Sequence, residues 1–290
     1  MPAEPVTATE PAAQPAPPPG SRAGRNLPAA IGVGVGLAAV VLVTLFTSKP
    51  AFAVVIAAAV GIGSWELVRA IRPVEARPPL VPLVVGGVAT TAMAWFGGAE
   101  SLLLGVLLTV VAVVIWRIPD GPIGFQRDVT AAVLVATYVP FLAGFAVLLV
   151  AEHDGVIRII TFIATVVCSD VGGYAAGVLA GRHPMAPSVS PKKSWEGMAG
   201  SLLACAVAGA AFLRLGYDNG VWWEGVIYGL AIAVAATLGD LTESMIKRDL
   251  GVKDMSSLLP GHGGLMDRLD SLLFAAPVAY LLMTAFVPAS

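Results

Sequence analysis

Long apolar stretches separated by short polar segments fill the chain from residue 27 onward. Each stretch is close to the roughly 20 residues that a helix needs to cross about 30 Å of hydrocarbon. Backbone groups in a bilayer must be satisfied internally, and the stretches lack the alternation typical of barrel strands. The pattern predicts an all-α, polytopic integral membrane protein with about nine transmembrane helices. The candidate spans are 28–46, 51–68, 80–97, 101–117, 130–150, 157–180, 196–214, 222–239 and 270–288.

Three regions of the chain differ in composition. Residues 1–25 are rich in Pro and Ala and lack apolar periodicity, which predicts a disordered tail. Residues 26–150 are predicted to be N-terminal membrane helices that act as a scaffold. Residues 151–290 are predicted to be C-terminal membrane helices that carry nearly all the distinctive polar sequence. We therefore expect the chemistry in this last region.

The overall composition narrows the functional classes. Hydrophobic residues make up 57% of the chain and charged residues 12%, against about 25% charge in soluble domains. The net charge of −2 provides no basic surface for a polyanion. A soluble enzyme and a nucleic-acid binder are excluded, and a lipid bilayer is the expected environment. Cys168 and Cys205 lie in apolar stretches, which predicts core residues and neither a disulfide nor a zinc site.

Lysine and arginine residues predict the orientation in the membrane. With nine spans, fourteen of the 17 basic residues fall on one side, and only Lys49, Arg158 and Arg214 fall on the other. The N-terminus is then cytoplasmic and the C-terminus is outside. An eight-span alternative drops one early helix and moves the N-terminus outside, but keeps the last two polar loops cytoplasmic. Glu66 and Arg69 lie near the end of the span 51–68, where charged side chains disfavour a full crossing.

A first polar cluster, SDVGGYAAG at 169–177, lies inside the sixth span. A carboxylate near the middle of a membrane helix costs at least about 2.5 kcal/mol unless it faces a cavity or a cation. Asp170 is therefore expected to be functional. Gly173, Gly177 and Gly181 recur every four residues, which favours close helix packing for the glycines themselves.

A second cluster, SPKKSWEG at 190–197, precedes the seventh span. Pro191 suits the first turn of a helix with Ser190 as its N-cap. Lys192 and Lys193 would then stand near free N–H groups that favour phosphate. Simple positive-inside bias explains the lysines equally well. Glu196 is expected to complete the cap or to neutralise a lysine.

The densest cluster covers residues 239–271. The helix of the eighth span brings its polar residues onto one face, because they follow i, i+3, i+4, i+7 spacing. A glycine-rich turn comes next, and its N–H groups could cradle phosphate. Two acids then open the ninth span. The helix face consists of Asp240, Glu243, Ser244 and Lys247, the turn of Pro260, Gly261, Gly263 and Gly264, and the acids are Asp267 and Asp270.

Carboxylates beside lysine and arginine have a definite meaning in nucleotide chemistry. Carboxylate oxygens hold a hard cation such as Mg²⁺, while basic groups neutralise charge during phosphoryl or nucleotidyl transfer. The chain has no Cys/His set for zinc and no P-loop. His262 either contacts phosphate or structures its loop. The competing interpretation of the cluster is a solvated loop with salt bridges, which leaves unexplained why acids sit at two helix ends beside a glycine-rich turn.

The same residues resemble the signature of the phosphatidate cytidylyltransferase (CDP-diacylglycerol synthase) family. The pattern S-x-x-K-R-x-x-x-x-K-D…P-G-H-G-G-x-x-D-R-x-D runs from Ser244 to Asp270, and the elements SDVGGYAAG and SPKKSWEG precede it in the family order. Val171 and Gly173 replace the usual Thr and Ala, so a role for that Thr hydroxyl is not carried over. The resemblance covers about residues 160–275.

The resemblance implies a dimeric membrane enzyme that joins CTP and phosphatidic acid to give CDP-diacylglycerol and pyrophosphate for phospholipid biosynthesis. It implies Mg²⁺, with K⁺ as an additional candidate, and a site on the cytoplasmic side of the cell membrane. By resemblance, Asp240 and Asp267 are metal ligands and catalytic residues. The further catalytic residues are Lys247, Arg248 and Asp249, and the substrate-binding residues are Asp170, Ser190, Lys192, Lys193, Ser244, Lys253, His262, Gly263, Gly264, Arg268 and Asp270.

Three alternatives belong to other functional classes. A CTP-dependent lipid-alcohol kinase would use similar helices but would release CDP and form a lipid phosphate. A secondary transporter would use Asp170 and Asp240 as ion sites, and it predicts inverted repeats that the sequence lacks. A structural scaffold gives no reason for the cluster at 239–271. The family signature favours the cytidylyltransferase.

Overall fold

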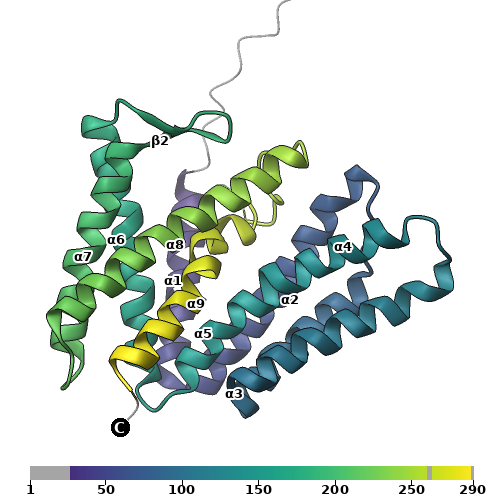
Figure 1. The fold of residues 1–290 in the computed structure, drawn as a ribbon, viewed down its shortest axis with the longest axis horizontal. Coiled ribbons are helices and arrows are strands. Elements are labelled where there is room, and N and C mark those ends of the chain that lie inside the picture. Colours follow the sequence, from purple (N-terminus) through teal and green to yellow (C-terminus); the bar gives the residue numbers. More distant parts are fainter. Residues whose placement is uncertain (1–26, 260–262, 289–290) are drawn as a thin grey trace, which may run out of the picture.

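The computed structural model describes residues 27–259 and 263–288, and these form an almost entirely helical molecule (Figure 1). The predicted tail at 1–25 and three residues of the predicted turn, Pro260, Gly261 and His262, lie outside the described residues. The helices are α1 (Leu27–Thr47), α2 (Lys49–Ile71), α3 (Leu80–Arg117), α4 (Phe125–Ala136), α5 (Leu142–Ala151), α6 (Gly155–Ala180), α7 (Trp195–Gly216), α8 (Trp222–Asp249) and α9 (Met266–Phe286). A hairpin of β1 (Pro184–Ala186) and β2 (Ser190–Ser194) joins α6 to α7, and a π-helical turn at Thr137–Phe141 joins α4 to α5.

The helices are long and apolar enough for a membrane. Within the described residues, seven segments meet the length and hydropathy of a membrane span, and Ile31–Thr47 of α1 adds a shorter apolar helix. The all-α polytopic class is therefore confirmed, while the number of nine crossings stays a prediction.

One of these segments, α3, contains two of the predicted spans. Gly98 breaks its helical geometry with a φ of 69° and a ψ of −158°. The hydroxyl oxygens of Thr90 and Thr109 lie 3.3 Å apart across the break, and a Cβ added to Gly105 would meet the Thr90 backbone. The chain thus folds back at Gly98 into two antiparallel arms, as the separate spans 80–97 and 101–117 predicted.

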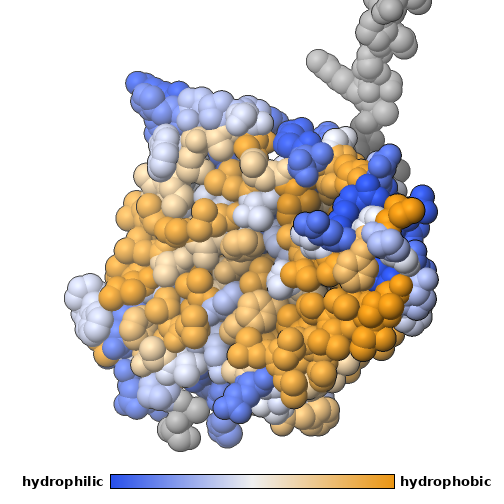
Figure 2. Space-filling model, turned by 45° about the vertical axis from the view of Figure 1, so that its right-hand side comes forward, coloured by the Kyte–Doolittle hydropathy of each residue, from blue (hydrophilic) through white to orange (hydrophobic). Residues whose placement is uncertain are grey.

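The outer surface carries the apolar belt that a bilayer requires. Large apolar side chains such as Leu107, Val111 and Ile115 are exposed along α3. Figure 2 shows apolar residues covering the middle of this face, with hydrophilic residues gathered at both ends. In water such a surface would be strongly unfavourable, so the molecule is a membrane protein.

The two ends of the helices carry different loops. At one end, the Lys49 ammonium donates to the backbone oxygens of Glu152 and His153, and Arg158 donates to Val287 O. The β1–β2 hairpin and the loop between α8 and α9 lie at the other end, away from the C-terminus (Figure 1). Lys49 and Arg158, predicted on the side with few charges, therefore do share one end.

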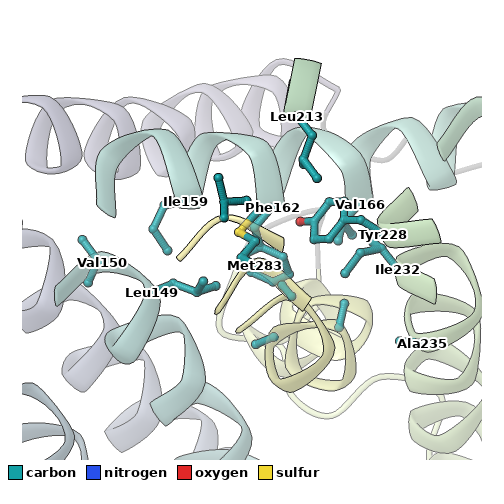
Figure 3. Close-up of a cluster of buried hydrophobic side chains, with 14 of the residues drawn as sticks. Leu149, Val150, Ile159, Phe162, Val166, Leu213, Tyr228, Ile232, Ala235 and Met283 are labelled. Atoms are coloured by element: carbon teal, nitrogen blue, oxygen red, sulfur yellow. The ribbon is translucent and has the colours of Figure 1, made fainter. Parts of the chain in front are cut away.

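Small residues allow α6, α7, α8 and α9 to pack closely around a buried core. A Cβ on Gly229 would fall 1.9 Å from Cys205 O, and one on Gly173 would fall 2.5 Å from Ser201 Oγ. Cys205 is buried, as predicted, and its thiol donates to Thr165 O, whereas Cys168 is only half-buried. Figure 3 shows part of the core, in which Tyr228, Ile232, Phe162, Leu213 and Met283 lie together. This packing fixes the four helices that surround the candidate site.

Candidate active site

A cavity of about 290 Å³ opens where the hairpin meets α6, α7, α8 and α9. Four of the predicted site residues line it, namely Asp170 from α6, Lys192 and Lys193 from β2, and Asp240 from α8. Ser271 of α9 also lines it, together with other hydroxyl side chains such as Ser169, Ser194 and Ser201. Residues from three separate sequence clusters thus converge on one cavity.

The hairpin corrects one local prediction. Ser190–Ser194 is a strand, so Ser190 is not an N-cap and Pro191 does not open a helix. The cap is Ser194, whose side chain accepts from Gly197 N–H at 3.1 Å. The residue before a proline is biased toward extended backbone, which favours a strand at Ser190. The predicted role of Glu196 is also wrong, because its carboxylate accepts from the backbone of Arg182 and His183 and contacts His183 Nδ1 at 2.6 Å.

An ion pair joins the hairpin to α8 across the cavity. Lys193 Nζ lies 2.5 Å from Asp240 Oδ2, and Ser244 Oγ donates to Asp240 Oδ1 at 3.3 Å. Asp170 interacts electrostatically with Asp270, Asp240 and Lys193. The cavity therefore combines acids and an ammonium group within mutual reach, as expected for a site that handles a charged substrate.

A second network lies on the same face of α8, one turn further on. Lys247 Nζ donates to Glu243 Oε2 at 2.7 Å and to Asp267 Oδ1 at 2.9 Å. Glu243 is fully buried, and the Asp267 side chain is only 5% exposed. The predicted polar face of α8 is thus confirmed by its i, i+4 contacts, and Asp267 of α9 joins it through the lysine.

Backbone N–H groups hold the other oxygen of Asp267. Met255 N–H and Gly264 N–H donate to Oδ2 at 3.1 Å and 2.7 Å. Gly263 N–H donates to Leu259 O instead. The N–H groups of Gly263 and Gly264 already have protein acceptors, so the phosphate-binding role expected of these glycines stays a prediction.

The remaining predicted residues surround the two networks. Arg248, Asp249, Lys253 and Arg268 are exposed, and Arg248 Nε donates to Val189 O of the hairpin at 3.4 Å. Ser190 is half-buried on β2, and Asp270 is half-buried on α9. None of these six lines the cavity.

Sequence reasoning missed Glu66 as a part of this region. Glu66 lies on α2, is fully buried, and accepts from Ser256 Oγ and from the backbone of Leu265 and Met266. The available signal was a carboxylate inside an apolar span, which is the same signal that selected Asp170. In the sequence, the charge of Glu66 was used only as an argument against a full crossing by the span 51–68.

The carboxylates of Asp170 and Asp240 in the cavity lining are hard oxygen ligands, which suit a hard divalent cation better than a soft one. Within the described ranges, no three Asp, Glu, His or Cys side chains can hold a metal ion by themselves. Mg²⁺ commonly binds through one or two carboxylates, with water and substrate phosphates as further ligands. The arrangement thus suits Mg²⁺ bound together with a nucleotide.

Comparison with known proteins decides the family. The sequence model of a family described as "Cytidylyltransferase family" matches residues 28–286. The chain belongs to this family. This chain is 42% identical over 279 residues to the phosphatidate cytidylyltransferase of Mycobacterium leprae, and the matched region covers 91% of this chain and 89% of the relative.

Other relatives carry the same description. The protein of Mycobacterium tuberculosis strain H37Rv is 40% identical over 91% of this chain and 84% of its own length. That of Haemophilus influenzae is 40% identical over 151 residues, which is 49% of this chain and 52% of the relative. The resemblance that rested on residues 160–275 is thus confirmed and extends to the N-terminal helices.

Proposed function

We propose that this chain transfers CMP from CTP to phosphatidic acid and releases pyrophosphate, forming CDP-diacylglycerol. The observation that carries the proposal is the cavity where Lys192, Lys193 and Asp240 meet at one end of a bundle of membrane helices. A chain with this cavity, and with relatives named phosphatidate cytidylyltransferase along most of its length, is suited to that reaction.

The chemistry needs no protein nucleophile, because a phosphate oxygen of the lipid attacks the α-phosphorus of CTP. The new P–O bond forms as the bond to the β-phosphate oxygen breaks, and pyrophosphate leaves with that electron pair. Both reactants are anionic, so catalysis consists mainly of charge neutralisation and in-line positioning. Lys192 and Lys193 line the cavity and would bind the phosphate oxygens there.

Asp240 and Asp267 would hold Mg²⁺, with K⁺ as an additional candidate. When bound, the cation would neutralise phosphate charge. Each of these carboxylates now contacts a lysine ammonium, from Lys193 and Lys247 respectively. These ammonium groups compete with a cation for the same oxygens, and the phosphates of CTP give both lysines new anionic partners.

The location of the cavity suits substrates from two phases. The diacyl substrate stays in the bilayer while CTP arrives from water, so the site belongs at the membrane edge. The distribution of Lys and Arg supports placing this edge on the cytoplasmic side of the cell membrane. A homodimer, implied by the family resemblance, is part of the same proposal.

We expect the purified chain to incorporate label from α-³²P-CTP into a chloroform-soluble product when phosphatidic acid and Mg²⁺ are present. EDTA should abolish incorporation, and added Mg²⁺ should restore it. A lipid-alcohol kinase would instead label lipid from γ-³²P-CTP, using diacylglycerol, and would release CDP. Full incorporation in metal-free buffer would contradict the metal dependence, and label transfer from the γ-phosphate would contradict the reaction.

The topology can be tested with single cysteines after Cys168 and Cys205 have been replaced. Ser188 of the hairpin and Ser257 of the α8–α9 loop are exposed, and Asn219 is exposed at the opposite end. In intact cells an impermeant maleimide should label Asn219→Cys but neither Ser188→Cys nor Ser257→Cys, and permeabilisation should expose all three. Labelling of Ser188→Cys or Ser257→Cys without permeabilisation would place the cavity on the outer side.

A further inference from the structure

Glu66 of α2 binds the beginning of α9. Its side chain is completely buried. Leu265 N–H donates to Oε1 at 3.0 Å, and Met266 N–H donates to Oε2 at 2.8 Å. Because the first N–H groups of a helix have no partner within it, a buried carboxylate at this place satisfies two of them and meets the positive end of the helix dipole.

The same carboxylate also holds the loop that leads into α9. Ser256 Oγ donates to Glu66 Oε1. The Asp267 carboxylate accepts from the neighbouring backbone N–H groups of Met255 and Gly264. Two carboxylates from different helices thus accept from four backbone N–H groups around the start of α9, two each.

Gly264 shows how tightly the two carboxylates enclose the loop. A Cβ added there would lie 3.0 Å from Asp267 Oδ2 and 3.0 Å from both Glu66 oxygens. The backbone therefore passes directly between the two acids. A small displacement of Glu66 would move the peptide that orients Asp267.

A buried charge in a membrane helix is maintained only where its surroundings stabilise it. Hydrogen bonds to a carboxylate are about twice as strong as neutral ones, and Glu66 accepts three of them, all from the segment 256–266. The charge thus stabilises the observed positions of Ser256 and of the first residues of α9.

We propose that Glu66 is a positioning residue that fixes the first turn of α9, and with it the Asp267 carboxylate, against α8. The inference rests on the proposed function, in which Asp267 holds a cation, and it gives a catalytic purpose to a helix from the predicted scaffold region. Glu66 acts through the backbone of Leu265 and Met266, and the lining of the cavity does not include it.

The test uses the full-length chain with Glu66→Gln, Ser256→Ala and Glu100→Gln. Glutamine can accept from only one of the two backbone N–H groups, and its own NH₂ then faces the other donor. Glu66→Gln should lower kcat about tenfold or more, the scale of one lost charge-assisted hydrogen bond plus one unsatisfied donor. Ser256→Ala should lower it about threefold, since one of three bonds is lost. Glu100 is exposed on α3 and provides the matched control.

If Glu66 were merely structural, its substitution would reduce the amount of folded protein but leave the activity of each folded molecule normal. If Glu66 is a positioning residue, Glu66→Gln should raise the Mg²⁺ concentration needed for half-maximal activity. It should also weaken Mn²⁺ binding, measured by electron paramagnetic resonance without substrates. Backbone amides at 264–268 should also exchange hydrogen faster in Glu66→Gln than in Glu100→Gln. If Glu66→Gln does not fold, Ser256→Ala decides by the same measurements.

Folded Glu66→Gln and Ser256→Ala proteins with wild-type kcat, Mg²⁺ requirement and Mn²⁺ binding would overturn the proposal. If the wild type transfers no CMP, the proposed function fails, whereas the exchange measurement still tests whether Glu66 fixes α9. Unchanged exchange at 264–268 would then overturn the inference by itself.

Discussion

Asp240→Asn and Asp267→Asn are each expected to lower CMP transfer by about 10²–10³-fold, the scale of losing one essential electrostatic group in an active site. Asparagine keeps the shape of the side chain but removes the negative charge that a cation requires. Asp240 lines the cavity, and Asp267, which is not part of the lining, is held by Met255 N–H and Gly264 N–H. The rate should be measured per folded molecule, because Asp267 is buried and paired with Lys247.

The double variant distinguishes a shared cation from two independent contributions. If Asp240 and Asp267 hold the same cation, removing both should cost little more than removing one, because residues that act as a unit are not additive. Asp218→Asn, exposed between α7 and α8, serves as the control and should keep the wild-type rate. Multiplicative losses would contradict the shared site, and near-normal turnover in stable single variants would contradict the metal role altogether.

The helices were predictable because the bilayer imposes a length and a composition on every span. The fold-back of α3 lies between the two spans that the sequence separates, at the pair Gly97–Gly98. The β1–β2 hairpin was not predicted, because a five-residue strand with two lysines has no apolar alternation, and its partner strand has only three residues. The N-cap was predicted at Ser190, whereas the structure has it at Ser194, four residues later.

The candidate site was predictable where its residues belong to one helix or to adjacent helix ends. The i, i+4 contacts of Asp240 with Ser244 and of Glu243 with Lys247 follow from helix geometry alone. The contact between Glu66 and Met266 joins residues 200 positions apart, and no local spacing rule can predict it. A charged residue in an apolar span predicts that a partner exists, but its identity depends on how the helices pack.

Lys247→Met is expected to destabilise the protein by about 3–5 kcal/mol, the range for breaking a buried ion pair by removing one partner. Methionine retains the length of the side chain but removes the ammonium group that joins Glu243 to Asp267. Glu243 is fully buried, and its Oε1 has no hydrogen-bond partner within the described structure, so this carboxylate would lose its counter-ion. Thermal unfolding in detergent measures the loss, and Lys253→Met, on an exposed lysine, should leave the unfolding temperature unchanged.

A second substitution separates the structural from the chemical contribution of Lys247. Glu243→Gln removes the uncompensated charge, so Lys247→Met combined with Glu243→Gln should recover much of the unfolding temperature. The rate should stay low, because Asp267 would still lack the ammonium group that lies 2.9 Å from its Oδ1. Recovery of both stability and rate would show that Lys247 only balances the charge of Glu243. Recovery of neither would show that the destabilisation comes from lost packing, because the uncompensated charge of Glu243 would already have been removed.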